Sequence, residues 1–177
     1  EIKENIELGI IRNHYVGRTF IEPTQQIRSL GVKLKHSVNK TLIKNKSLIL
    51  IDDSLVRGTT SVKIVKMLYE FGAKEVHLRI ASPPIKYPDY YGVDTPTKNE
   101  LLASKLDLEG MKKYINATTL QFLSIEGLYK SMGYEKRNIS YPQFTDHCFT
   151  GEYPVKPIDA SGKDFLDNQL TLMSSKS

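Results

Sequence analysis

The stretch LILIDDSLVRGTTS, residues 48–61, decides how the rest of the chain is interpreted. It opens with four apolar residues in a row, which is typical of a parallel strand buried on both faces. Two carboxylates, Asp52 and Asp53, follow where that strand must end. Gly58 and three hydroxyl residues then lead into an apolar run of rough helical spacing, residues 62–69. This order predicts a phosphate site, because loop amides and a helix N-terminus attract anions.

The acidic pair restricts the kind of ligand that this site can take. Carboxylates beside a phosphate repel it unless they bind sugar hydroxyls, or a Mg²⁺ ion that bridges to a diphosphate. Phosphoribosyl diphosphate (PRPP) has ribose hydroxyls, a terminal phosphate and a diphosphate, so it satisfies every part of the pattern. A P-loop is disfavoured because no Gly-Lys-Ser/Thr ending is present. A buried strand followed by a polar turn, with no ligand, is the remaining alternative.

The same stretch resembles the PRPP-binding signature of type I phosphoribosyltransferases. The resemblance implies that Asp52 and Asp53 hold the ribose hydroxyls and Mg²⁺. It also implies that the neighbouring loop binds the rest of PRPP, with the 5′-phosphate held mainly by backbone amides and hydroxyls; these residues are Ser54, Arg57, Gly58, Thr59, Thr60 and Ser61. We also expect Thr59 or Thr60 to act as the N-cap of the following helix.

A second resemblance involves NHYVGRTFIEPTQQIRSLGVKLK, residues 13–35. From the residues alone, 13–26 form either a lid that closes on an anion or an exposed basic loop. The segment resembles the flexible active-site loop of the amidophosphoribosyltransferases, which displace diphosphate from PRPP with glutamine-derived ammonia in the first step of de novo purine synthesis. The resemblance makes Arg18 and Lys35 catalytic, with Lys35 at the diphosphate. His36 stands where the family usually has Leu.

Composition narrows the class of protein. A chain of 177 residues can bury one substantial core. Its net charge of +5 comes from residues 1–46, which hold nine Lys and Arg against four Glu, and their dispersed arrangement favours a small polyanion over nucleic acid. We expect no membrane segment and a cytoplasmic location, and the one cysteine, Cys148, fits a reducing compartment.

The remaining pattern predicts an α/β fold. Short strands are expected at 7–11, 75–81 and 120–125, and short helices at 97–104, 106–114 and 127–132, with Gly72 ending the helix that follows the motif. A strand, helix, strand order indicates a parallel sheet with a right-handed crossover. We therefore expect a type I phosphoribosyltransferase-like parallel sheet flanked by helices, incomplete at its N-terminal side. Residues 1–132 would form this domain and residues 133–177 an irregular C-terminal extension.

Two segments, YPDYYG at 87–92 and CFTGEYP at 148–154, resemble the branch of the family that carries an iron–sulfur cluster. Such a cluster needs four cysteine thiolates. Asp89 and Thr145 stand where that branch has cysteines, so Cys148 alone remains. We expect no iron–sulfur cluster and interpret Cys148 as a packing residue.

The resemblance covers only the C-terminal part of the sequences of the family. The glutaminase domain and the upstream piece of the transferase domain have no counterpart in these residues, so the chain is expected to be inactive alone. The expected partners are PRPP, an upstream glutaminase-containing polypeptide and, if complete, further copies of itself. A different PRPP-dependent transferase and a non-catalytic PRPP- or nucleotide-binding module or remnant stay open as alternatives.

Overall fold

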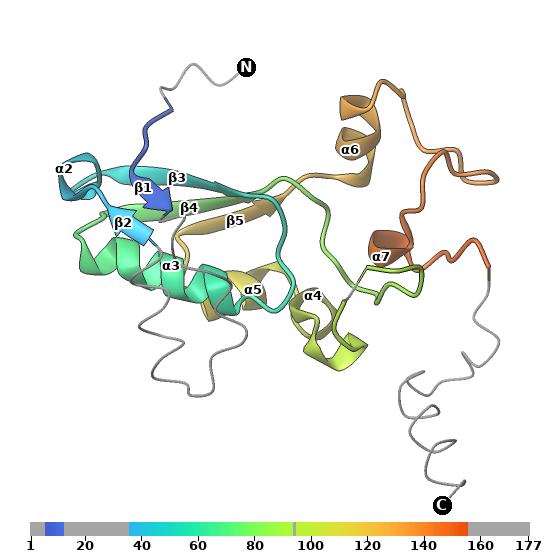
Figure 1. Cartoon of the computed structure of the whole chain (residues 1–177), viewed down its shortest axis with the longest axis horizontal. Helices are drawn as coiled ribbons and strands as arrows, with labels where there is room; N and C mark the ends of the chain where they lie inside the picture. The colour runs from blue at the N-terminus through green and yellow to red at the C-terminus, as the bar shows by residue number, and fades with distance from the viewer. Residues whose placement is uncertain (1–5, 13–35, 94, 156–177) are drawn as a thin grey trace, which may run out of the picture.

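A computed structural model describes residues 6–12, 36–93 and 95–155, and these residues form an α/β fold. Three parallel strands make the central sheet in the order β3 (Ser47–Asp52), β4 (Glu75–Ile80) and β5 (Thr119–Phe122) (Figure 1). Leu50 pairs with Leu78, which in turn pairs with Leu120. The predicted parallel sheet and all three of these elements are confirmed, with bounds that differ by at most three residues.

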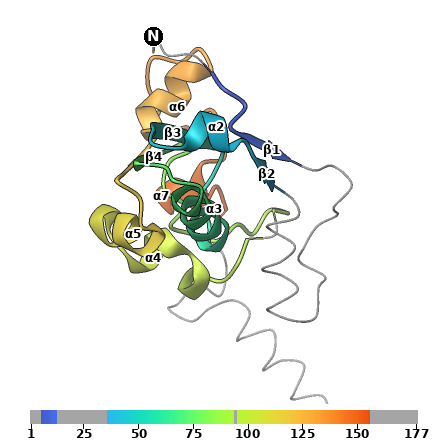
Figure 2. The same cartoon turned by 90° about the vertical axis from the view of Figure 1, so that its left-hand side faces the viewer.

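Helices α3 (Thr59–Glu70) and α5 (Leu108–Ile115) connect the strands and cover one face of the sheet. Figure 2 shows both helices on the same side of the strands. The alternate β4 residues Val76, Leu78 and Ile80 are buried against them, because successive side chains of a strand point to opposite faces. The helix after the motif ends as predicted, with Gly72 at a positive φ of 91° and its N–H bonded to the Tyr69 carbonyl.

The opposite face of the sheet is open within the described residues. Ile49 and Ile51 are 50% and 66% exposed, so the prediction of a strand buried on both faces is wrong for the described part of the chain. The apolar run Leu48–Ile51 suits burial on both sides, but the described helices α3 and α5 cover one side only. A second face with exposed isoleucines is typical of a sheet that another segment or chain covers.

The N-terminal part forms a separate antiparallel pair, β1 (Ile10–Arg12) with β2 (His36–Val38). The short helix α2 (Lys40–Ile43) follows, with the Asn39 side chain accepting the Thr41 N–H at 3.2 Å. The sequence predicted a strand near β1 but no helix at α2, because four residues show no helical period. Asn39 was the available signal, since Asn is a favoured N-cap.

Four short helices complete the described fold: η2 (Lys98–Glu100), α4 (Leu102–Lys105), α6 (Ile125–Ser131) and α7 (His147–Thr150). The helix predicted over 97–104 is divided because Leu101 has an extended backbone, with φ −72° and ψ 121°. In the described ranges, no helix has the length and apolar character needed to cross a membrane.

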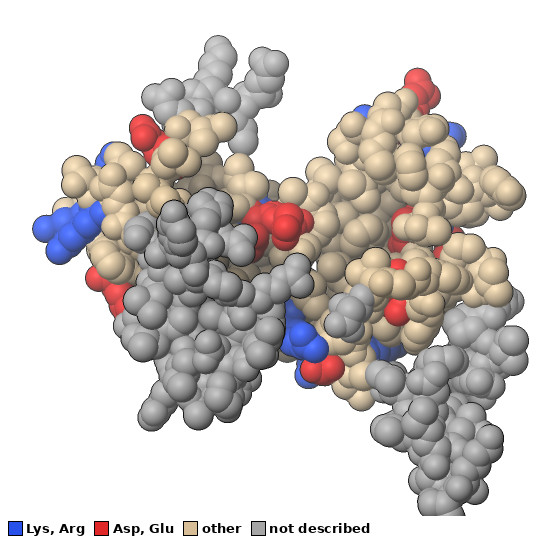
Figure 3. Space-filling model, viewed as in Figure 1, with Lys and Arg blue, Asp and Glu red and all other residues tan. Residues whose placement is uncertain are grey.

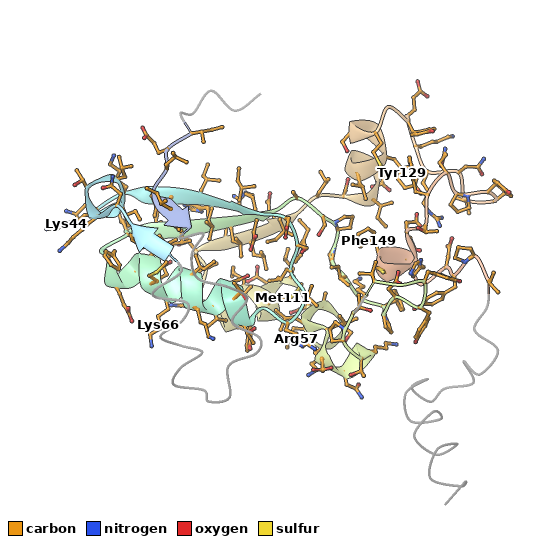
Figure 4. The ribbon with its side chains drawn as sticks, in the orientation of Figure 1. Lys44, Arg57, Lys66, Met111, Tyr129 and Phe149 are labelled. Atoms are coloured by element: carbon orange, nitrogen blue, oxygen red, sulfur yellow. The ribbon has the colours of Figure 1, made fainter. Side chains whose placement is uncertain are left out.

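A buried ionic network attaches the residues after 132 to α6. The Asp146 carboxylate is 4% exposed and accepts hydrogen bonds from the Tyr129 hydroxyl at 2.9 Å and from both Nε and Nη2 of Arg137. The second partner of Arg137 is Glu152, at 2.6 Å from Nη2. Figure 4 shows Tyr129 on α6 and Phe149 on α7, which are the two elements that this network joins.

Candidate functional site

The acidic pair lies at the carboxyl end of β3, as the sequence predicted. Asp52 is the last residue of the strand, and its Oδ1 accepts the Asp53 N–H at 3.1 Å. Asp53 is exposed, and its Oδ1 accepts the Ser54 hydroxyl at 2.8 Å. In open α/β sheets, ligands bind at this end of the strands. The pair is therefore positioned to meet a ligand above the sheet edge.

The electrostatics of the pair favour a cation. Burial raises the pKa of Asp52 above its usual 3.8, and the neighbouring charge of Asp53 also raises it, while the hydrogen bond from the Asp53 N–H opposes both. The ionised form of Asp52 is therefore less stable here than in water. A cation or a set of sugar hydroxyls at Asp52 and Asp53 would relieve this cost.

Gly58 begins α3 from a tightly packed position. Its φ is +74°, and a Cβ placed there would lie 2.7 Å from Leu102 Cδ2 and 3.2 Å from Tyr114 Cε1. Gly58 is itself the N-cap and no side chain caps the helix, so the prediction that Thr59 or Thr60 is the N-cap is wrong. A left-handed backbone at this corner is easiest for glycine, and this fixes where the helix starts.

The first turn of α3 offers backbone donors to an anion. Val62 makes the first intrahelical bond, to the Gly58 carbonyl at 3.0 Å, so the N–H groups of the three residues before it have no acceptor within the helix. Thr59 and Thr60 are exposed, whereas Ser61 is 3% exposed. The first turn also contains no acidic residue that would repel a phosphate. Exposed donors and the helix dipole together suit a phosphate.

Arg57 stands beside this turn in an ion pair with Glu100 of η2. Its Nε and Nη2 both lie 3.2 Å from Glu100 Oε1, and both side chains are nearly half exposed (Figure 4 labels Arg57). Desolvation raises the pKa of Glu100, but the Arg57 charge and hydrogen bonds outweigh it, so the pKa lies below 4.5. An exposed ion pair of this kind contributes little, because water and salt screen it. A phosphate can therefore compete with Glu100 for Arg57.

The predicted site residues are brought together only in part. Figure 3 shows a furrow between the sheet with its helices and the α6–α7 part, with acidic side chains on its rim. A separate cleft of about 730 Å³ is lined by the α4–α5 turn and the end of β5, and neither the acidic pair nor residues 57–61 line it. Arg18 and Lys35 lie outside the described residues.

A second polar cluster, which the sequence did not predict as a unit, lies where α7 meets the loop after β4. His147 Nε2 is 2.7 Å from Asp89 Oδ2, and Cys148 Sγ is 3.7 Å from the same oxygen. Burial and the Asp89 charge raise the pKa of the Cys148 thiol to about 11. With a single cysteine in the chain, these residues do not fit an iron–sulfur cluster. The adjacent His147 and Cys148 were the available signal.

Known proteins resemble this chain closely. An amidophosphoribosyltransferase of Rhizobium etli is 59% identical over 170 residues, which are 96% of this chain and 34% of that protein. The Bacillus subtilis amidophosphoribosyltransferase is 49% identical over 150 residues, 85% of this chain and 31% of that protein. No protein-family model matches the chain.

A solved structure agrees with these sequences. The glutamine PRPP amidotransferase from B. subtilis, complexed with ADP and GMP, superposes with a TM-score of 0.71 at 50% identity. The chain is a homologue of the amidophosphoribosyltransferases. It matches their C-terminal part, and it spans about a third of the length of these relatives: the superposition covers 84% of this chain and 32% of the amidotransferase. The resemblance to the amidophosphoribosyltransferases that the sequence indicated is confirmed.

Proposed function

We propose that this chain supplies the PRPP-binding part of an amidophosphoribosyltransferase. The observation that supports the proposal best is the junction of β3 and α3. Two carboxylates stand at the end of the strand, and the helix that follows begins with an exposed N-terminus. The reaction would convert PRPP and glutamine-derived ammonia to 5-phosphoribosylamine and diphosphate. A glutaminase-containing polypeptide would supply the ammonia, in a cytoplasmic enzyme of several copies.

Different residues of the site would bind different parts of PRPP. Asp52 and Asp53 would bind the ribose hydroxyls and hold Mg²⁺, which their oxygen donors and the raised pKa of Asp52 suit. Bound Mg²⁺ would take charge off the diphosphate. The 5′-phosphate would bind the α3 N-terminus, and Ser54 would hold the acidic pair in place through Asp53. Residues with this role at the phosphate are Arg57, Gly58, Thr59, Thr60 and Ser61. Arg18 and Lys35 would stabilise the leaving diphosphate.

The direct test is PRPP binding by the chain, measured calorimetrically with and without Mg²⁺. Binding that requires Mg²⁺ is the expected result, and ammonia-dependent release of diphosphate should appear only when the upstream polypeptide is added. Absence of PRPP binding in both mixtures would contradict the proposal.

Replacing Asp53→Asn should weaken Mg²⁺-dependent PRPP binding at least tenfold, a loss of about 1.4 kcal/mol, because an amide is a poorer metal ligand. The fold should be unaffected, since Asp53 is exposed and its side chain bonds only to Ser54 among the described residues. Asp107→Asn, an acidic N-cap of α5 away from the loop, is the matched control. Equal affinities in the wild type and Asp53→Asn would show that this carboxylate has no role in the site.

Replacing Lys35→Ala should reduce turnover of the complemented enzyme about 100-fold with little change in PRPP affinity. The reason is that charge on the diphosphate is largest as it departs, so a cation there acts mainly on the transition state. Single-turnover kinetics and PRPP binding measured in parallel separate the two effects. A loss of affinity that matches the loss of rate would instead mean that Lys35 binds ground state and transition state alike.

A non-catalytic PRPP- or nucleotide-binding module is the second candidate. It is favoured by the nucleotides ADP and GMP in the solved structure of the B. subtilis enzyme. Binding of PRPP or nucleotide without turnover, even after complementation, would support it. A different PRPP-dependent transferase would accept a nucleobase in place of ammonia.

A further inference from the structure

The cluster of Asp89, His147 and Cys148 brings three metal-binding donor types to one point. One ligand atom from each residue lies within 4.8 Å of the others. The two segments that carry them are held together independently, because the Lys86 and Tyr87 N–H groups donate to the Cys148 carbonyl at 2.9 and 3.1 Å. The donors are therefore placed by the backbone as well as by their own contacts.

The carboxylate is oriented as a ligand would be. Asp89 Oδ1 accepts the N–H groups of Tyr91 at 2.7 Å and Val93 at 3.1 Å, which leaves Oδ2 directed at His147 and Cys148. Outer hydrogen bonds of this kind fix ligand geometry in metal sites. Among the described residues, His147 is the one basic side chain in contact with the Asp89 carboxylate, and the Asp89 side chain is 7% exposed.

The imidazole is enclosed and only partly satisfied. His147 is 2% exposed, with the Tyr91 and Tyr153 rings at centroid distances of 4.9 and 5.0 Å. Its Nδ1 is buried and has no hydrogen-bond partner among the described residues. A buried imidazole with only one hydrogen bond has an unsatisfied polar nitrogen. The bond to Asp89 places the other nitrogen, Nε2, beside the carboxylate oxygen that Cys148 also contacts.

We infer that Asp89, His147 and Cys148 form a mononuclear site for a borderline divalent cation such as Zn²⁺, with solvent as the fourth ligand. Carboxylate oxygen, imidazole nitrogen and thiolate are the ligands that Zn²⁺ takes in proteins. Tetrahedral ligands lie about 3.3–3.7 Å apart at these bond lengths. Cys148 Sγ and Asp89 Oδ2 already have that spacing. Binding the ion requires the hydrogen bond between His147 and Asp89 to widen and the donors, which now lie within 4.8 Å of one another, to adjust to the tetrahedral spacing. The thiol proton is released to solvent.

The test uses the untagged chain, stripped with a chelator and titrated with Co²⁺ and then Zn²⁺. We expect one Co²⁺ per chain, a thiolate-to-cobalt charge-transfer band in the near ultraviolet, and loss of the band when Zn²⁺ displaces Co²⁺. Cys148→Ser should remove the band and weaken Zn²⁺ binding at least tenfold. His77→Gln is the matched control, because His77 lies on the sheet and bonds Thr119, and it should keep the band.

Three results would overturn the inference: no cobalt band in the wild type, a band retained in Cys148→Ser, or an iron–sulfur spectrum with stoichiometric sulfide. If Cys148→Ser fails to fold by circular dichroism, Asp89→Asn decides instead, because it keeps the size of the side chain and should also weaken Zn²⁺ binding at least tenfold. An unchanged affinity in Asp89→Asn would contradict the site. PRPP binding plays no part in this test, so its outcome is independent of the proposed function.

Discussion

Replacing Asp146→Ala should lower the free energy of unfolding by about 3–5 kcal/mol, because it leaves the Arg137 guanidinium and the Tyr129 hydroxyl without their shared buried partner. Arg137 is 11% exposed and Tyr129 is fully buried, so water cannot replace the lost carboxylate. Equilibrium denaturation in urea measures the change. The loss is a large fraction of the stability of an ordinary domain.

The matched control is Glu152→Ala, which removes the other partner of the same Arg137. Glu152 is 56% exposed, so its removal should cost no more than about 1 kcal/mol. Equal losses in Asp146→Ala and Glu152→Ala would mean that the network is not buried in solution. Both variants lie far in sequence from the β3–α3 loop and leave its residues intact.

The same network should weaken in acid. Desolvation raises the pKa of Asp146, but the hydrogen bonds from Arg137 and Tyr129 outweigh it, so the folded pKa lies below 3.8. A depressed carboxyl pKa contributes stability that is complete above the unfolded value and is lost as the pH falls through the folded value. The difference in unfolding free energy between wild type and Asp146→Ala should therefore shrink below about pH 3.8. A pH-independent difference would exclude ionisation of Asp146 as its source.

The sequence predicted the sheet and the motif well because both follow from local pattern. The apolar run, the acidic pair and the glycine fix β3, its end and the start of α3 within a few residues. The exposure of Ile51 could not be predicted in this way, since an apolar residue looks the same whether its cover belongs to the described residues or lies outside them. The apolar pattern of a strand indicates that its face requires cover, but it does not indicate which segment supplies that cover.

The site was predictable to the extent that it is contiguous. Residues 52–61 came from one stretch, whereas the Arg57–Glu100 pair and the Asp89–His147 contact join residues 43 and 58 positions apart. Local sequence pattern does not show which residues so far apart in the chain form a contact. The N-cap prediction failed for a different reason: packing of Gly58 against Leu102 and Tyr114 selects a glycine, and this overrides the usual preference for a hydroxyl residue.

Gly58→Ala should destabilise the chain by about 2–4 kcal/mol and weaken PRPP binding with it. A left-handed φ costs an L-residue about 1–2 kcal/mol, and a Cβ at 2.7 Å from Leu102 Cδ2 adds an overpacking cost of about 1–3 kcal/mol. Leu102 is 5% exposed, so its side chain has little room to withdraw. Urea unfolding and PRPP calorimetry on the same preparation measure both effects.

Gly133→Ala separates the two causes, because Gly133 has a φ of +87° but nothing lies within 4 Å of its Cβ position. It should show the backbone cost alone. A double-mutant cycle of Gly58→Ala with Leu102→Ala should show coupling of about 0.5–3 kcal/mol, since the smaller side chain makes room for the new methyl group. If Gly58→Ala and Gly133→Ala cost the same and the cycle shows no coupling, then Gly58 is required for its backbone conformation and not for its contact with α4.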